Sequence, residues 1–280
     1  MNKIKNTNKD INKTAKIVVG IILTVGGLVM IMPFIWMILS SLKTDAEIMR
    51  IPPTIWPRQL TIENFEKLFT EFNFLLYLKN TLIIVACSFG GLFLNAMAGY
   101  GFAKFKFKGK TVLFYMVLAT MMIPGQVTMI PVYLILSKVG LTNTMVGIVL
   151  PGLVGAFGIF LFRQFMSNIS DELLEAARLD GASEARIFLR IVLPVCRPII
   201  AVQGILAFIA GWNSFLWPLI MANDEKFYTL SVGLSLLKGQ YASNYALQMA
   251  GSTFMVIPII IIFIAFQKYI LDGFNVSGMK

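Results

Sequence analysis

The densest group of charged side chains in this sequence lies in the stretch EAARLDGASEARIFLRIVLP, residues 175–194, between two long apolar runs. Carboxylates and basic groups at such a density could serve acid–base chemistry or recognition of another protein. The chain contains no histidine, which removes the commonest general base and the commonest metal ligand. We therefore predict no catalytic residue and no metal site, and we regard this stretch as a candidate interaction site.

The flanks of the stretch predict two short helices joined by a turn. Ser170 is a favourable N-cap residue for a first helix, which should end near Leu179. Gly181 supplies the left-handed residue that commonly follows a helix. Ser183 then caps a second helix, which Pro194 should terminate. The prediction is a helix, a turn and a helix, exposed to water between the two apolar runs.

The first predicted helix carries an apolar and small-residue surface beside its charged residues. The apolar and small residues are Leu173, Leu174, Ala176, Ala177 and Leu179. Small residues allow close approach by another backbone, which a helix seated in a partner's groove requires and a solvated loop does not. The pattern favours docking to a partner, with a packed connector between two spans as the alternative.

A second group of candidates consists of polar side chains within the apolar runs. They are Asn95, Gln126, Gln203, Trp212, Asn213 and Ser214. Such groups commonly tie membrane helices together by hydrogen bonds. They could instead line a route for a hydroxyl-rich solute, because amides bind hydroxyls and an aromatic face packs against a sugar ring. We take them as the candidate substrate pathway.

Three prolines, Pro124, Pro131 and Pro151, also fall within the apolar runs. Each removes a helical donor and is able to bend or break a helix. The string MIPGQVTMIP predicts local unwinding near Gln126, and a simple packing kink is the alternative.

Nucleotide hydrolysis by this chain is not supported. The fragment GKT at residues 109–111 resembles the end of a phosphate-binding loop, but Lys104 stands where that loop requires a glycine. No strand is predicted before it. We expect no bound cofactor in this chain.

The elements that position these candidates are membrane spans. The 280 residues are 57% hydrophobic and 14% charged, with a mean hydropathy of +0.77, which is too apolar for an ordinary soluble domain. Runs of about 20 apolar residues suffice to cross a bilayer as helices. The predicted spans are 17–42, 80–103, 111–137, 139–162, 198–223 and 239–267, the last with its spanning part beginning near Leu247. An all-α integral membrane protein with six transmembrane helices follows, since no period-two alternation indicates a barrel.

Lysine and arginine placement predicts the orientation. The tail 1–16, the loop KFKFKGK at residues 104–110 and the loop 167–197 fall on one side, and these segments with the C-terminus hold almost all of the net charge of +10. By the positive-inside rule that side is the cytoplasm, so both termini are cytoplasmic and residues 43–79 are external. The basic excess then requires only the lipid bilayer as its partner, and no nucleic acid. The first span is read as retained, because it is too long for a signal peptide.

The cysteines predict no covalent or metal framework. Cys87 lies within the second span and Cys196 near the cytoplasmic start of the fifth, so a disulfide between them is not expected.

The stretch that holds residues 175–194 resembles the EAA motif of permease subunits from binding-protein-dependent ABC importers. Glu-Ala-Ala, Asp-Gly-Ala and the closing Ile-Val-Leu-Pro stand at the family spacing. The strings GYGFAKFKFKGK, MIPGQVTMIPVYLILSKVGLTNT, FGIFLFRQF, WNSFLWPL and DEKFYTLSVGL resemble the carbohydrate-uptake branch, specifically its smaller, maltose-permease-like partner. The resemblance covers nearly the whole chain after the first helix, while the first 40 residues and the loop 43–79 contribute little to it.

This resemblance implies the type I ABC importer permease fold and a division of the chain. Residues 1–16 would be a cytoplasmic tail, 17–42 the first transmembrane helix, 43–79 an external loop, 80–270 a core of five transmembrane helices, and 271–280 a cytoplasmic tail. Within the core, residues 167–197 would form the coupling loop.

The resemblance also implies residue roles. Contact with a cytoplasmic ATPase would fall to Glu175, Ala176, Ala177, Asp180, Gly181 and Ala182. The external segment around Gln240, Tyr241 and Asn244 resembles one that reaches toward the solute-binding protein. The tail GFNVSGMK resembles one that lies near the ATPase dimer interface.

The function that these observations favour is that of a permease subunit of an ATP-driven importer for a sugar or related polyhydroxylated solute, in the bacterial cell membrane. Its implied partners are a second permease subunit, two ATPase subunits that bind ATP and Mg, and an extracytoplasmic solute-binding protein. The alternative is an ion- or proton-coupled secondary transporter, which would need charged groups in the spans or repeated halves, and neither is apparent. A membrane-embedded enzyme would lack both histidine and an intramembrane carboxylate.

Overall fold

The computed structural model describes the backbone of residues 2–240 and 244–276, and the side chains of residues 15–237, 239 and 244–268. Every regular element among these residues is helical. The chain forms two compact units: Met1–Phe72 with Lys238–Met255, and Asn73–Leu237 with Val256–Lys280.

The smaller unit is built on the long helix α1, Asn2–Ser41, whose exposed side chains are predominantly apolar. Its other elements are α2 (Asp45–Ile48), α3 (Glu63–Thr70) and the first part of α15 (Tyr245–Val276). Phe69 of α3 meets Phe254 of α15 edge to face, with ring centroids 6.1 Å apart. The Asp45 carboxylate accepts a hydrogen bond from the Ala246 backbone N–H at 3.3 Å.

The larger unit holds most of the candidate residues and begins with α4, Phe74–Lys104. Its further elements are α5 (Lys110–Thr120), α6 (Gly125–Lys138), α7 (Met145–Val149), the 3₁₀ turn η1 (Leu150–Gly152), α8 (Ala156–Met166), α9 (Asp171–Leu179), α10 (Glu184–Ile187), the π turn η2 (Phe188–Val192), α11 (Leu193–Val195), α12 (Arg197–Trp212), α13 (Leu216–Met221), the 3₁₀ turn η3 (Glu225–Phe227) and the start of α14 (Leu230–Gln240).

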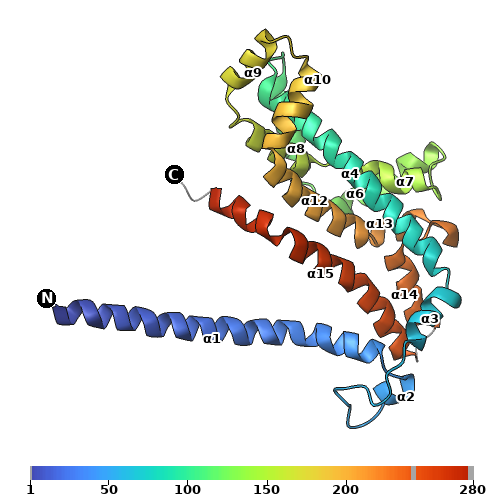
Figure 1. The fold of residues 1–280 in the computed structure, drawn as a ribbon. Coiled ribbons are helices and arrows are strands. Elements are labelled where there is room, and N and C mark those ends of the chain that lie inside the picture. Colours follow the sequence, from blue (N-terminus) through green and yellow to red (C-terminus); the bar gives the residue numbers. More distant parts are fainter. Residues whose placement is uncertain (1, 241–243, 277–280) are drawn as a thin grey trace. The chain divides into compact units, whose positions relative to one another are not determined.

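Helix α4 is the central element of this unit and packs along α8 and α12 (Figure 1). The contact with α8 is close because Gly99 has no side chain: a Cβ atom there would lie 2.5 Å from the Phe162 Cβ and 2.9 Å from the Arg163 backbone nitrogen. Helix α4 runs from one end of the larger unit to the other. Its C-terminal end lies beside α9 and α10, and its N-terminal end is bonded to the segment around η3.

The core beneath the α9–α10 hairpin joins three parts of the chain. Its fully buried members include Phe162, Met166, Leu174, Ile187 and Val192, with Ala96 and Tyr100 from α4. Burying side chains of this size contributes about 1.5–3 kcal/mol each. The hairpin is consequently anchored on α4 and α8.

The candidate spans agree in part with the prediction of six helices. Four are long and apolar enough to cross a bilayer: Ala15–Ser41, Phe74–Lys104, Met145–Met166 and Tyr245–Lys268. Two bent pairs, Lys110–Thr120 with Gly125–Lys138 at 103° and Glu184–Val195 with Arg197–Trp212 at 81°, bring the number to six only if each pair is one span.

Three predicted spans are interrupted. The run 111–137 divides between α5 and α6 just before Pro124, which lacks the N–H that would continue a helical ladder. The run 139–162 contains the 3₁₀ turn at Pro151. The run 198–223 is split after Trp212, where α12 ends and α13 begins four residues later.

Candidate functional site

The turn between α9 and α10 has the geometry of a Schellman motif. The Gly181 N–H donates to the Arg178 carbonyl and the Ala182 N–H to the Ala177 carbonyl, both at 3.0 Å. Gly181 has a φ of +78°, the left-handed conformation predicted for it. The Ser183 hydroxyl accepts from the Arg186 N–H at 3.3 Å and so caps α10 as predicted. The sequence therefore specifies this turn locally.

Ser170 occupies the N-cap position of α9 as predicted, although its hydroxyl donates to the Glu172 carboxylate and accepts no bond from a backbone N–H. One local prediction was wrong. Pro194 does not end the second helix, which continues to Val195 and breaks at Cys196. The π turn η2 just before Pro194 widens the helix, which accommodates a residue that has no N–H to donate.

Helix α9 has an inward and an outward face. Leu174 is 1% exposed, and Ala177 packs with Ala182 against the core described above. Glu175, Ala176, Asp180 and Gly181 are exposed. Leu179 is 89% exposed, which is unusual for a leucine on a structured helix and marks the outward face as partly apolar. Of the predicted ATPase-contacting residues, four are therefore exposed on the hairpin and two alanines support it from beneath.

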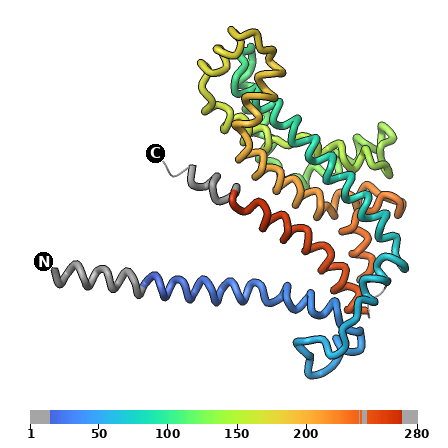
Figure 2. The backbone as a smooth tube through the Cα atoms, viewed as in Figure 1, coloured from blue at the N-terminus to red at the C-terminus, as the bar shows by residue number. Residues whose placement is uncertain are grey.

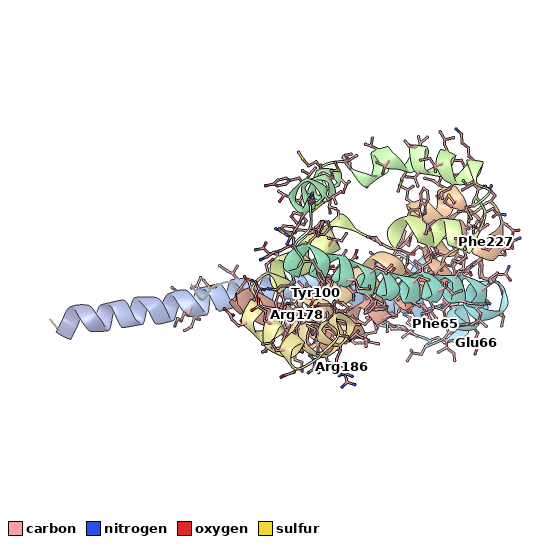
Figure 3. The ribbon with its side chains drawn as sticks, turned by 90° about the horizontal axis from the view of Figure 1, so that it is seen from above. Phe65, Glu66, Tyr100, Arg178, Arg186 and Phe227 are labelled. Carbon is pink, nitrogen blue, oxygen red and sulfur yellow. The ribbon has the colours of Figure 1, made fainter. Side chains whose placement is uncertain are left out.

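A first tie holds the hairpin on α4. The Tyr100 hydroxyl donates to Glu184 Oε2 at 3.0 Å, and Arg178 Nε donates to Glu184 Oε1 at 2.6 Å. Figure 3 shows Tyr100 and Arg178 near each other at this end of the unit. Glu184 thus connects the end of α9 to α4, and its proximity raises the pKa of the Arg178 guanidinium.

A second tie is made by Lys104, the last residue of α4. Its ammonium donates to Asp171 Oδ1 at 2.6 Å and to the Ile169 carbonyl. This hydrogen bond and the lysine charge lower the pKa of the Asp171 carboxyl. Asp171 is exposed and solvent screens the pair, so its role is positional more than stabilising. Neither Lys104 nor Tyr100 was singled out as a site residue, although both lie in GYGFAKFKFKGK, one of the strings that carry the family resemblance.

A cavity of about 450 Å³ lies among α4, α6, η1, α12 and α13. Its polar lining comprises Ser88, Gln126, Thr128 and Ser214, and Trp217 adds an aromatic wall. The Trp217 indole N–H is satisfied by the Ile148 carbonyl at 3.1 Å, which fixes the ring. This volume is typical of small-molecule sites. Two predicted pathway residues, Gln126 and Ser214, line the cavity.

The other four predicted pathway residues lie elsewhere. Asn95 ties two helices, since its Oδ1 accepts from the Gly155 N–H at 3.0 Å. Gln203 is 7% exposed, and its amide nitrogen has no partner among the described residues. Trp212 is buried and stacks on Phe208 with centroids 5.6 Å apart. Asn213 is exposed at the end of α12. None of the four lines this cavity, and Asn95 and Trp212 make packing contacts between or within helices.

The predicted external contact is only partly described. Tyr241 lies outside the described residues, as does the Gln240 side chain. Asn244 caps α15, because its Oδ1 accepts from the Leu247 N–H at 2.9 Å. The last four residues of the predicted tail, 277–280, also lie outside the description.

The opposite end of α4 is bonded to the segment DEKFYTL. Asn80 donates to the carbonyls of Lys226 and Tyr228 at 2.8 and 2.9 Å, and the Thr81 hydroxyl accepts from the Leu230 N–H at 2.8 Å. The Glu225 carboxylate accepts from Asn73 and Tyr77. This segment, around η3, is thereby fixed to α4. Across the described part of the chain, no group of three potential metal-ligating side chains gathers.

Membrane-length helices, a hairpin with exposed small residues and a polar-lined cavity among the helices are the features expected of a membrane permease. The chain belongs to the binding-protein-dependent transport system inner membrane component family, whose pattern matches residues 91–275. This membership favours the importer over the secondary transporter considered above.

Similar proteins and structures agree with this assignment. The chain is 36% identical over 270 residues to the arabinooligosaccharides transport system permease protein AraQ of Halalkalibacterium halodurans, covering 92% of this chain and 96% of that one. It is 31% identical to the lactose transport system permease protein LacG of Rhizobium radiobacter, covering 90% and 92%. The fold matches a crystal structure of a bacterial ABC transporter involved in the import of the acidic polysaccharide alginate, with a TM-score of 0.81 at 23% identity, covering 92% and 96%.

Proposed function

We propose that this chain is one permease subunit of an ATP-driven importer that carries a sugar or a related polyhydroxylated solute across a bacterial cytoplasmic membrane. Relatives named for arabinooligosaccharides, lactose and sn-glycerol-3-phosphate support the solute class. The chain would pair with a second permease subunit, two cytoplasmic ATPase subunits and an extracytoplasmic solute-binding protein. A solved complex of the alginate transporter with a pentasaccharide-bound periplasmic protein supports the last of these partners.

The observation that carries the proposal is the outward face of α9. It presents Ala176, Leu179 and Glu175 to solvent on a helix that is held from the other side by the buried Leu174 and by Ala177. A small, partly apolar face on a rigid hairpin fits a groove in another protein, and exposing it without a partner is unfavourable. We infer that this face seats on the ATPase, which binds ATP and Mg, while this chain binds no cofactor.

Coupling would follow from differential contacts. Closure of the ATPase pair around ATP moves the hairpin, and the ties at Tyr100 and Lys104 transmit that movement to α4. Rotation of the helices around α4 would then turn an inward-open cavity outward. The coupling free energy must come from contacts that α9 makes with the ATPase when the cavity is open to one side and loses when it is open to the other.

The 450 Å³ cavity is the proposed solute route in this subunit. Hydroxyl groups of Ser88, Thr128 and Ser214, with the Gln126 amide, match the hydrogen-bonding groups of a polyhydroxylated solute. The fixed indole of Trp217 offers a flat apolar surface to a sugar ring.

A cysteine cross-linking experiment tests the docking. In the assembled complex, Ala176→Cys should cross-link to the ATPase, because Ala176 faces outward. Ala177→Cys is the matched control, since it is the next residue on the same helix and packs against this chain's own core. Cross-linking from both positions alike, or from neither, would contradict the proposed contact.

A further inference from the structure

The loop between α2 and α3 covers two buried charged side chains that precede it, Lys43 and Glu47, and carries exposed apolar side chains on its outside. The exposed apolar residues of this segment, residues 49–62, are Met49, Ile51, Ile55, Trp56, Leu60 and Ile62. Ile51 is 93% exposed and Trp56 72%. This arrangement is the reverse of that in a water-facing loop, where apolar side chains turn inward.

The interior of the loop is held by specific hydrogen bonds. Lys43 is fully buried, donates to the Thr54 carbonyl and lies 4.8 Å from the centroid of the Trp36 ring. Glu47 is 8% exposed and accepts from the Thr54 hydroxyl at 2.7 Å and from the Arg58 N–H at 2.9 Å. With its polar groups satisfied inside, the loop displays its apolar residues as a fixed surface.

Further bonds place this surface at the end of α1. Asn64 donates to the Ser41 and Lys43 carbonyls at 2.9 and 2.8 Å, and the Thr61 N–H donates to the Leu42 carbonyl at 3.0 Å. Figure 2 shows the loop beside the last turns of α1. The apolar surface of the loop therefore lies next to the end of a candidate membrane span.

The length of that span locates the loop in depth. Lys16 is the last charged residue before the apolar run of α1, and from Lys16 to Ser41 the helix rises about 38 Å at about 1.5 Å per residue. A hydrocarbon core is about 30 Å thick, so the Ser41 end lies at the level of the lipid headgroups. Because residues 49–62 are hydrogen-bonded near the Ser41 end of α1, their apolar surface lies at the boundary between headgroups and acyl chains.

We propose that residues 49–62 form an interfacial anchor that inserts its apolar side chains into the external leaflet of the membrane. Arg50 and Arg58 are exposed beside these side chains and suit the lipid phosphates above them. Tryptophan is enriched at this level of membranes, which fits Trp56. A binding protein or the second permease subunit would be the competing occupant, but the two exposed arginines and the attachment of the loop to the end of α1 favour lipid.

The test uses the complete transporter in lipid nanodiscs, with Cys87 and Cys196 replaced by alanine. An environment-sensitive fluorophore is attached to a single cysteine at Ile51→Cys. The matched control is Glu66→Cys on α3, an exposed position in the same unit (Figure 3). Quenching by a phospholipid that carries a nitroxide near its headgroup, and by aqueous iodide, is measured at both positions.

The anchor predicts that the label at residue 51 is quenched by the nitroxide lipid at least about threefold more than the label at residue 66, and less by iodide. Adding the solute-binding protein should leave the lipid quenching unchanged. Equal lipid quenching at the two positions overturns the proposal. Shielding that appears only with the binding protein would assign the surface to that protein, and shielding from lipid and iodide alike would assign it to the second permease subunit.

A variant within the loop tests whether the lipid quenching arises only because the fluorophore itself inserts into the membrane. With the fluorophore at Leu60→Cys, replacing Ile51 and Trp56 by asparagine should abolish most of the lipid quenching. Trypsin cleavage after Arg58 should stay slow, because the substitutions leave the bonds of Lys43 and Glu47 intact. Unchanged quenching in this variant would contradict insertion of the loop.

Discussion

At the scale of single residues, the conformation of Gly181 is the most constrained feature of the hairpin. A Cβ atom at this position would meet nothing within 4 Å, so a substitution acts through the backbone alone. The φ of +78° costs an ordinary L-residue about 1–2 kcal/mol, more for a β-branched one, while asparagine tolerates it better.

We predict that Gly181→Val lowers binding-protein-stimulated ATP hydrolysis and uptake together, whereas Gly181→Asn retains most of both. The measurement is ATPase activity and solute uptake of the purified complex in liposomes, with subunit stoichiometry as the control. Equal activities of the two variants would show that the left-handed turn is not required.

Glu47 makes the loop of the smaller unit sensitive to acid. The Thr54 hydroxyl and the Arg58 N–H hold the pKa of Glu47 below its ordinary value of 4.5. A lowered pKa in the folded protein means that the carboxylate's contribution is complete above the ordinary value and is lost as the pH falls through the lowered one. Hydrogen-exchange protection of the Arg58 amide, corrected for the intrinsic rate, should drop over that range. Glu47→Gln should remove most of this pH dependence, and protection that is constant down to the lowest pH would contradict it.

At the scale of elements, the packing of α4 on α8 determines whether the ties at Tyr100 and Lys104 can act. Gly99 permits this close approach, while Gly101, two residues later on the same helix, has open space around it. The two glycines form a natural pair for comparison.

Gly99→Val should force α4 and α8 apart, at a cost of about 1–3 kcal/mol or more. Gly101→Ala should leave stability unchanged or raise it by up to about 1 kcal/mol, since alanine favours a helix. The stability of both variants is measured as the temperature at which the purified complex ceases to be monodisperse. A Gly99→Val protein as stable as Gly101→Ala would mean that the helices do not pack as described.

The same elements show what was predictable from the sequence. The Gly181 turn and the Ser183 cap depend on residues within a few positions of each other, so local patterns predicted them. The Tyr100–Glu184 bond joins residues 84 positions apart, and no local pattern encodes it. The breaks at Pro124 and Pro151 were indicated as possible kinks, but their size depends on packing. Two of the six predicted pathway residues line the cavity and four do not, because polarity alone does not say which way a side chain points.

At the scale of the whole molecule, family membership and fold assign this chain to membrane transport, and the outward face of α9 is the proposed connection to the source of energy. Glu175 is exposed on that face. Reversing its charge should leave the fold and membrane insertion intact, because it contacts solvent and lies outside the candidate spans.

The most direct measurement of this coupling is the rate of ATP hydrolysis and of solute uptake by the complete transporter in liposomes, for Glu175→Lys against the parent. Glu66→Lys makes the same charge change on an exposed residue of α3 and serves as the control. We predict that Glu175→Lys assembles normally and loses about tenfold in uptake, equivalent to about 1.4 kcal/mol of coupling, with hydrolysis falling alongside or continuing without transport. Parental rates of both hydrolysis and uptake in an intact Glu175→Lys complex would contradict the account.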